Sequence, residues 1–172
     1  MNTELQNPLA GVPIPANAPA PGESIRLERP EPGLIRLVLD PPHRKLAVFD
    51  VPMLLDLEAA IAEVEREGSL RGLIISGANP LTFAGGADLE AIGKLETPEA
   101  VQRYIAFGQA LFQRIFKLSR GGGGALMVVA AIGGPIPGGA CEIALACDRI
   151  VLTRDDKTRI GLPEVQLGIV PG

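Results

Sequence analysis

The sequence has little of several residue types on which common kinds of active site depend. Its 172 residues include no tryptophan, one tyrosine, one histidine and two cysteines. The histidine, His43, lies in a polar turn, far along the chain from Cys141 and Cys147, which disfavours both a catalytic triad on His43 and a zinc site of histidine and cysteine. The spacing of the cysteines suits neither a disulfide within one helix nor a CxxC site, so we expect reduced core thiols.

An excess of positive charge and long apolar runs are also missing. The chain has 16 Lys and Arg residues and 20 Asp and Glu residues, and the net charge of −4 gives no broad positive field for a nucleic acid. No apolar run approaches the roughly 20 residues that span a bilayer, and the N-terminus has no basic region followed by a hydrophobic stretch. We therefore expect a cytoplasmic protein with no nucleic-acid partner and no membrane span.

What is present predicts a proline-rich arm followed by one α/β domain. Residues 1–22 contain five prolines among small and polar residues, so we expect a flexible or docked arm, with the domain at residues 23–172. Apolar alternation and short apolar runs predict strands at residues 25–28, 34–39, 73–75 and 128–132. Caps and helical periodicity predict helices at residues 50–68, 97–118 and 138–147. This alternation of strands and helices favours a parallel sheet with crossover helices.

Two glycine-containing segments each lead from a buried strand toward a helix: residues 83–89 (FAGGADL) and residues 133–142 (GGPIPGGACE). Free N–H groups that converge at such positions can stabilise negative charge on a carbonyl oxygen, and the same geometry also binds phosphates. Neither segment has the spacing GxGxxG or GxxxxGK[ST], which disfavours a nucleotide-binding loop. Asp88 and Asp148 close small or apolar segments, so we expect them to be caps or loop anchors.

Glu142 and Glu164 are the candidate acid/base residues. Glu142 lies in the first turns of an otherwise apolar helix, where a carboxylate has no evident structural role. Glu164 follows Pro163 at the boundary of an element. The alternatives are a solvated residue on an exposed helix face for Glu142 and an ordinary helix-capping glutamate for Glu164.

These segments resemble the crotonase superfamily, whose hydratases and isomerases act on acyl thioesters of coenzyme A. The resemblance runs from about Ser24 to the last residue and is most specific in residues 83–89, 128–148 and 160–172. It implies an α/β fold of the crotonase type, a ββα superhelix (spiral). The resemblance also implies that the backbone N–H groups of Ala87 and Gly139 are oxyanion donors.

By this resemblance, Glu142 and Glu164 are the acid/base pair of an enoyl-CoA hydratase, which carries out syn addition of water across the 2,3 double bond of an enoyl-CoA thioester in fatty-acid β-oxidation. It implies an acyl-CoA substrate, no metal, no separate cofactor because coenzyme A is part of the substrate, and a homo-oligomer (a trimer or dimer of trimers). The alternatives are a double-bond isomerase of the same fold, which can work with a single acid/base residue, and a non-catalytic fragment or CoA-binding module.

A weaker resemblance links residues 40–49 to the coenzyme A-binding turn in the hydratase part of bifunctional β-oxidation proteins. It implies that Arg44 and Lys45 meet the phosphates of coenzyme A, and the alternative is a charged surface turn. The substrate- and CoA-binding residues that the resemblance implies are Arg44, Lys45, Ala47, Gly85, Gly86 and Asp88.

The sequence also departs from the family pattern. Residues 121–126 form an insertion, which we expect to loosen the approach to the second oxyanion donor, and the loop at residues 154–157 is longer than usual. Ala140 replaces a common glycine. The chain stops at Gly172, where family members continue with further helices, so we expect a C-terminally incomplete fold. We also expect its helices at residues 51–67 and 98–118 to present more apolar surface than the chain can cover, which favours aggregation or oligomerisation.

Overall fold

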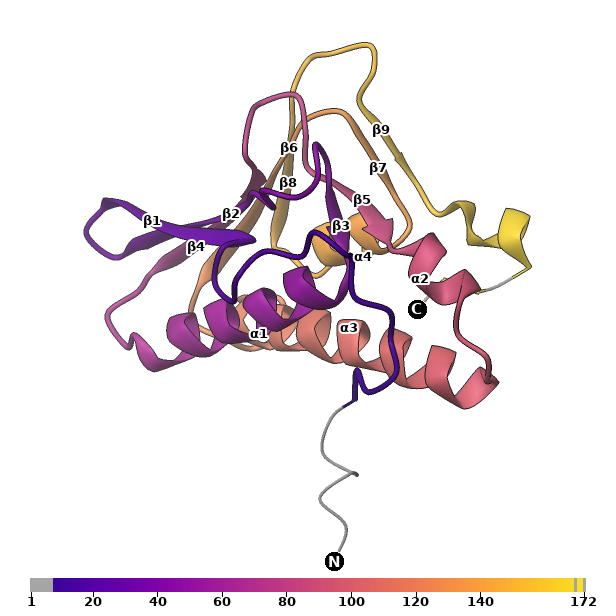
Figure 1. The fold of residues 1–172 in the computed structure, drawn as a ribbon. Helices are drawn as coiled ribbons and strands as arrows, with labels where there is room; N and C mark the ends of the chain where they lie inside the picture. The colour runs from indigo at the N-terminus through magenta and orange to yellow at the C-terminus, as the bar shows by residue number, and fades with distance from the viewer. Residues whose placement is uncertain (1–7, 169, 172) are drawn as a thin grey trace, which may run out of the picture.

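A strand of a main sheet, a short strand outside it and a helix follow one another repeatedly along the chain (Figure 1). The computed structural model describes residues 8–168 and 170–171. After strand β1 (Ile25–Glu31), the first unit is β2 (Leu34–Leu39), β3 (Ala47–Phe49) and α1 (Val51–Arg66), and the second is β4 (Gly72–Gly77), β5 (Ala84–Ala87), α2 (Leu89–Gly93) and α3 (Pro98–Leu118). The third unit is β6 (Met127–Ile132), β7 (Pro135–Pro137) and α4 (Gly139–Leu145). The fourth is β8 (Arg149–Leu152), β9 (Arg159–Gly161) and the 3₁₀ helix η2 (Pro163–Leu167).

The main sheet has five strands in the order β1-β2-β4-β6-β8. Strand β1 pairs with β2 in an antiparallel hairpin, whereas β2, β4, β6 and β8 are parallel neighbours. The short strands form two further parallel pairs, β3 with β5 and β7 with β9. Because neighbouring strands come from successive units, each unit is one turn of a spiral, as the predicted ββα superhelix requires.

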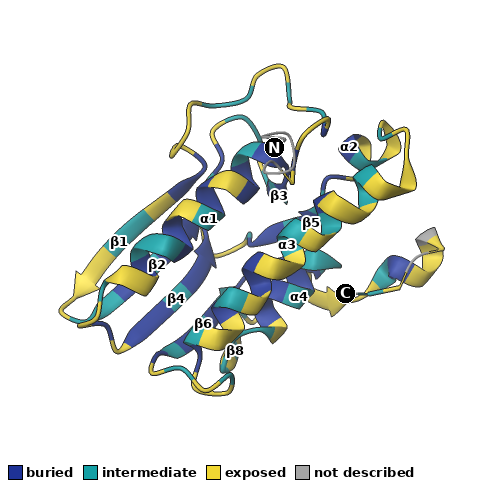
Figure 2. Cartoon of the chain, turned by 90° about the horizontal axis from the view of Figure 1, so that it is seen from below, coloured by how far each residue is buried: buried dark blue, intermediate teal, exposed yellow. Residues whose placement is uncertain are grey.

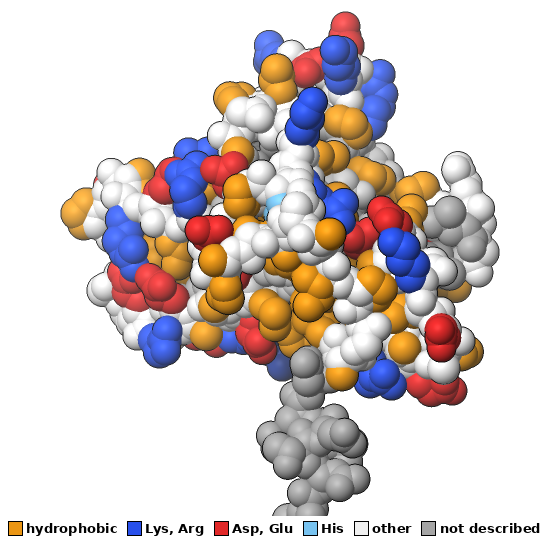
Figure 3. Space-filling view, viewed as in Figure 1, with side chains coloured by type: hydrophobic (Ala, Val, Ile, Leu, Met, Phe, Trp, Pro, Cys, Tyr) orange, Lys and Arg blue, Asp and Glu red, His pale blue; other side chains and the backbone are white. Residues whose placement is uncertain are grey.

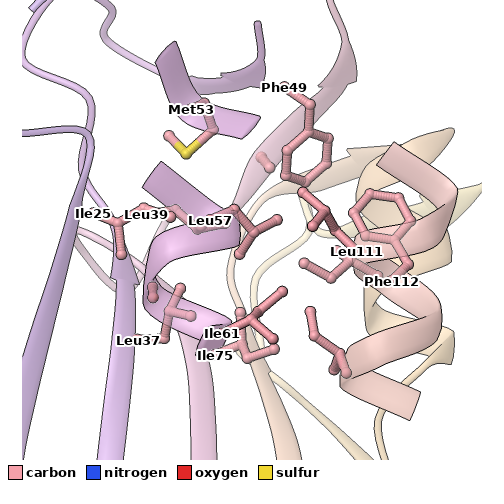
Figure 4. Close-up of a cluster of buried hydrophobic side chains, with 14 of the residues drawn as sticks. Ile25, Leu37, Leu39, Phe49, Met53, Leu57, Ile61, Ile75, Leu111 and Phe112 are labelled. Carbon is pink, nitrogen blue, oxygen red and sulfur yellow. The ribbon is translucent and has the colours of Figure 1, made fainter. Parts of the chain in front are cut away.

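Helices α1 and α3 lie side by side against the sheet (Figure 1). Asp50 accepts a hydrogen bond from the N–H of Met53 and Thr97 accepts one from the N–H of Ala100, which confirms both predicted N-caps. Figure 4 shows Leu57 and Ile61 of α1 between the sheet and α3. Each such fully buried side chain contributes about 1.5–3 kcal/mol to the stability of the fold.

Burial follows this layering (Figure 2). Strands β2, β4 and β6 carry fully buried side chains, and the outer faces of α1 and α3 are exposed. Each of these helices has an exposed large apolar side chain, Leu55 on α1 and Phe116 on α3, and the expected excess of apolar surface stays a prediction. Further exposed large apolar side chains lie in the C-terminal part of the described chain, and they include Leu145, Val151, Leu152, Ile160, Leu162 and Val165.

The predicted strands and long helices are all present, but the sequence did not predict the short elements β3, β5, β7, β8, β9 and α2. Strands of three or four residues contain too few positions to show a period of two, and the two glycine-containing segments were interpreted as turns. Their pairing is therefore a consequence of tertiary structure, set by the spiral rather than by local propensity.

The tetraglycine at residues 121–124 forms a turn that is tied down by hydrogen bonds. The carboxylate of Asp148 accepts from the backbone N–H groups of Arg120 (3.2 Å), Gly121 (2.7 Å) and Val128 (2.8 Å), which confirms that Asp148 is a loop anchor. This turn lies before the first residue of β6, whereas Gly139 follows β7 beyond the other end of β6. The turn thus lies at the opposite end of β6 from Gly139, and the expected loosening of the approach to Gly139 stays a prediction.

The described part of the N-terminal arm, residues 8–22, lies against the domain. Leu9 and Val12 are buried, and the carboxylate of Asp56 on α1 accepts hydrogen bonds from the N–H groups of Gly22 (2.7 Å) and Ser24 (2.8 Å). These contacts correspond to a docked arm. Its flexibility and the domain boundary at residue 23 stay predictions.

The surface carries charges of both signs. On the face shown in Figure 3, basic and acidic side chains are interspersed with apolar ones. Within the described ranges, no helix is long and apolar enough to cross a membrane.

Candidate active site

The two glycine-containing segments meet where β5 runs beside β7 and the start of α4. A Cβ atom added to Gly86 would lie 2.9 Å from the carbonyl oxygen of Pro137 and 3.5 Å from the amide nitrogen of Gly139. A Cβ atom added to Gly139 would lie 3.7 Å from the amide nitrogen of Ala87. The amide nitrogens of Ala87 and Gly139 are therefore close to one another, although these residues are distant in the sequence.

This close approach depends on glycine at two positions. Gly86 has a φ of +90°, and Gly138, the N-cap of α4, has a φ of +56° with a ψ of −129°. Residues other than glycine rarely adopt these backbone conformations. In addition, a Cβ atom at Gly138 would lie 2.8 Å from Oε1 of Glu164. The glycines thus allow β5, α4 and the Glu164 carboxylate to approach one point.

A largely apolar cavity of about 190 Å³ opens at this point. The rings of Phe49 and Phe112 pack edge to face in its wall, with centroids 5.3 Å apart, and helix α3 also contributes Tyr104 and Ile105. The predicted site residues that line it are Gly85, Gly86, Ala87, Gly139, Glu142 and Glu164. The structure therefore brings both predicted oxyanion donors and both predicted acid/base residues to one cavity.

The two carboxyl groups reach the cavity from different elements. Glu142 is half-buried in the first turn of α4, and Glu164 is 8% exposed on η2. Oε2 of Glu164 is buried and has no hydrogen-bond partner among the described residues. An unpaired buried oxygen is costly to the fold, so the contacts within the described residues do not account for the position of this carboxyl group.

The pKa of the Cys141 thiol reflects the two nearby carboxyl groups. Burial, followed by the charges of Glu142 and Glu164, raises the pKa of Cys141 above its ordinary value. Burial is also the main cause that raises the pKa of Cys147 to about 12, and both cysteines are free thiols, as expected. In the part of the chain that the structure describes, no group of three or more His, Cys, Asp or Glu side chains is arranged to hold a metal ion.

The residues predicted to bind coenzyme A divide between several environments. Gly85 and Gly86 line the first cavity, as given above. Arg44 and Asp88 line a second cavity of about 440 Å³, which the arm residues 13–17 and His43 also border. Lys45 is exposed, and Ala47 is buried at the start of β3, where it pairs with Ala84.

Arg44 is not a free surface cation. Its Nε is 2.8 Å from Oδ2 of Asp50 and its Nη2 is 2.7 Å from Oδ2 of Asp88, so it joins the N-caps of α1 and α2. Asp88 also accepts hydrogen bonds from the N–H groups of Glu90 and Ala91, which confirms it as a cap.

His43 belongs to the same buried cluster. Its Nε2 lies 2.8 Å from Oδ2 of Asp50, and its side chain is 2% exposed. The turn at residues 41–45 is polar in sequence, but the arm lies against it, which is why the imidazole of His43 is buried.

Sequence reasoning missed the part that Tyr104 plays in the site. Tyr104 was counted only as one of the apolar positions of its helix, yet its hydroxyl donates to the carbonyl oxygen of Phe49 and accepts from the N–H of Asp88 at 3.3 Å. The signal that could have found it is that the only tyrosine of the chain occupies a helix face otherwise made of apolar residues.

A spiral of strand–strand–helix units with a cavity between successive turns is the crotonase fold. Comparison with known proteins makes the assignment specific: the chain belongs to the enoyl-CoA hydratase/isomerase family, whose model matches residues 30–172. The sequence-based resemblance to the crotonase superfamily is thus confirmed.

Individual relatives are longer than this chain. It is 36% identical over 150 residues to the fatty acid oxidation complex subunit alpha of Vibrio vulnificus, a match that covers 87% of this chain and 20% of that protein. Among solved structures it is similar to the enoyl-CoA hydratase of Bacillus anthracis (TM-score 0.73, 26% identity, 87% of this chain and 54% of that one). It is equally similar to human mitochondrial delta3-delta2-enoyl-CoA isomerase (TM-score 0.74, 28% identity, 87% and 55%). The chain thus spans about a fifth of the curated relative and about half of the solved structures.

Proposed function

We propose that this cavity adds water across the 2,3 double bond of an enoyl-CoA thioester, a hydratase reaction of fatty-acid β-oxidation. One observation carries the proposal: two carboxyl groups, those of Glu142 and Glu164, line the same cavity as the amide nitrogens of Ala87 and Gly139. A double-bond isomerase needs only one acid/base residue, whereas addition of water uses two.

The chemistry follows from the positions of these groups. The thioester carbonyl oxygen accepts hydrogen bonds from the N–H groups of Ala87 and Gly139, which stabilise the enolate that forms when water adds to carbon 3. One carboxylate takes a proton from the attacking water while the other carboxyl group delivers a proton to carbon 2. We propose that both carboxyl groups act on the same face of the double bond, which gives syn addition.

We further propose that coenzyme A binds along β3 and β5, at Arg44, Lys45, Ala47, Gly85, Gly86 and Asp88. Lys45 is exposed and available to a phosphate, whereas Arg44 would share its guanidinium with Asp50 and Asp88. The reaction needs no separate cofactor, because coenzyme A is part of the substrate. A homo-oligomer, as a trimer or dimer of trimers, a cytoplasmic location and the absence of a nucleic-acid partner belong to the same proposal.

The absorbance of the conjugated enoyl thioester tests the reaction. A hydratase removes this absorbance from a 2-enoyl-CoA, whereas an isomerase creates it from a 3-enoyl-CoA. Loss of absorbance with the 2-enoyl substrate supports the hydratase, and a gain with the 3-enoyl substrate alone supports the isomerase. Binding of either thioester without a change would identify a non-catalytic CoA-binding module.

Substitution of each glutamate tests the residue assignment. We expect Glu142→Gln and Glu164→Gln each to lower kcat by about 100-fold or more, the usual scale for one acid/base group. Glu65→Gln is the matched control, because Glu65 is exposed on α1 and pairs with Arg114 far from the cavity. Near-full activity in both cavity variants would contradict the assignment.

A further inference from the structure

The hydroxyl of Tyr104 bridges two backbone groups, one at the end of β3 and one just after the end of β5. It donates to the carbonyl oxygen of Phe49 at the end of β3 and accepts from the N–H of Asp88, the residue after the end of β5. The three residues are 2%, 3% and 5% exposed, so water does not offer an easy alternative partner. This hydroxyl is therefore a buried link between β3 and β5.

The link occurs where the pairing of β3 with β5 is irregular. Ala47 pairs with Ala84 and Phe49 pairs with Ala87, so β5 advances one residue more than β3 between the two pairs. Such a bulge re-aims the backbone groups around it and weakens the regular ladder. Tyr104 supplies hydrogen bonds from α3 just beyond the bulge, at the peptide that follows Ala87.

We propose that Tyr104 is a positioning residue, whose hydroxyl holds the end of β5 so that the N–H of Ala87 points at the thioester carbonyl. The inference rests on the proposed function, in which Ala87 is an oxyanion donor. Tyr104 also lines the cavity, and this positioning role is separate from any contact with the acyl chain.

The other contacts of Asp88 cannot replace this link. Its side chain accepts from the first N–H groups of α2 and from Arg44, and so it fixes the start of α2. The Tyr104 hydroxyl instead holds the Asp88 backbone N–H and ties it to β3. Burial is the main cause that raises the pKa of Tyr104 above its ordinary value, so the hydroxyl keeps its proton and remains a donor over the working pH range.

The test is the absorbance of a bound aryl-acrylic CoA thioester whose hydration equilibrium favours the unsaturated form. Hydrogen bonds to its carbonyl polarise the conjugated system and move its absorbance to longer wavelength. We expect Tyr104→Phe to lose at least about half of this shift and to lower kcat by about 10- to 100-fold, with KM changed by less than about twofold. A merely structural role would lower the melting temperature without reducing the shift.

The control is Thr97→Ala, which removes another side chain–backbone hydrogen bond of α3, at the N-cap. We expect it to lower the melting temperature but to keep the full absorbance shift. If Tyr104→Phe also keeps the full shift while the unchanged chain shows it, the Tyr104 inference is overturned and the proposed function stands. If the unchanged chain shows no shift, the oxyanion role of Ala87 and Gly139 fails, and this inference fails with it.

A second variant keeps the test decisive if Tyr104→Phe does not fold. Because the chain has one tyrosine, biosynthetic 3-fluorotyrosine replaces this residue alone and keeps the hydroxyl. The fluorine withdraws electron density from the oxygen, which becomes a weaker acceptor for the N–H of Asp88. We expect a smaller absorbance shift than in the unchanged chain, and an equal shift would overturn the inference.

Discussion

The functional importance of the close contact between β5 and β7 can be tested by substituting two glycines that differ in the space around them. Gly86 and Gly123 have nearly the same φ, +90° and +89°. A Cβ atom at Gly86 would lie 2.9 Å from the carbonyl oxygen of Pro137, whereas a Cβ atom at Gly123 would have nothing within 4 Å. Substitution by alanine therefore places a Cβ atom at positive φ in both positions, and adds a steric clash at Gly86 only.

The magnitudes follow from this difference. The backbone strain of a residue held at positive φ is about 1–2 kcal/mol, and we expect this loss of stability in both variants. The contact with a backbone oxygen at Gly86 is relieved only if the strands separate, and such overpacking costs about 1–3 kcal/mol more. Separation also moves the amide nitrogens of Ala87 and Gly139 apart, so we expect kcat to fall by about 10- to 100-fold in Gly86→Ala.

Urea denaturation and the enoyl-CoA absorbance assay measure the two effects. Gly123→Ala should lose stability without loss of kcat, because its turn lies before β6. The reasoning would be refuted if the two variants had the same stability and the same activity. It would also be refuted if Gly86→Ala lost stability but kept full kcat, since the strand separation would then not reach the amide pair.

Two further predictions concern carboxylates outside the cavity that accept hydrogen bonds from backbone N–H groups. Burial alone would raise the pKa of Asp148, but its backbone N–H donors outweigh burial and lower the pKa below its usual 3.8. The stabilisation is therefore present above about pH 4 and is lost as the pH falls through the lower pKa of the folded state. We expect Asp148→Asn to lower the melting temperature at pH 7, and to differ less from the unchanged chain below pH 4. Asp56→Ala leaves the N–H groups of Gly22 and Ser24 without their carboxylate, and we expect a loss of about 1–3 kcal/mol in urea denaturation. Faster proteolytic cleavage within residues 8–22 should accompany this loss, and unchanged cleavage would show that Asp56 does not hold the arm.

The sequence predicted best those features that depend on neighbouring residues. The N-caps Asp50 and Thr97 bond to residues three positions ahead, so a short window contains the whole signal. The hairpin of β1 with β2 and the long helices show full hydrophobic periods. Tertiary contacts did not change any of these elements, because the local preference and the spiral agree.

The contacts that were missed join residues far apart in the sequence. Arg44 and Asp88 are 44 positions apart, and Tyr104 and Phe49 are 55 positions apart. Composition gives no reason for these partners to meet, and only the spiral places successive units in contact. Local pattern made Glu142 a candidate, because a carboxylate in an apolar helix has no evident structural role. Family resemblance, rather than local pattern, assigned the roles of Ala87, Gly139 and Glu164.

The placement of Glu164 depends on hydrogen bonds more than on apolar packing. Glu164 belongs to the unit of β8, β9 and η2. The strands of this unit are largely exposed, and Ile160 in β9 is 44% exposed. Backbone hydrogen bonds attach this unit: the N–H of Gly138 donates to the carbonyl oxygen of Gly161 (3.0 Å), and that of Thr153 donates to Ile132 (2.9 Å). Gly138 is also the residue whose missing side chain makes room for the Glu164 carboxylate. The same residue thus anchors the strand before Glu164 and leaves space for its side chain, which couples the distance between the two glutamates to the pairing of β7 with β9.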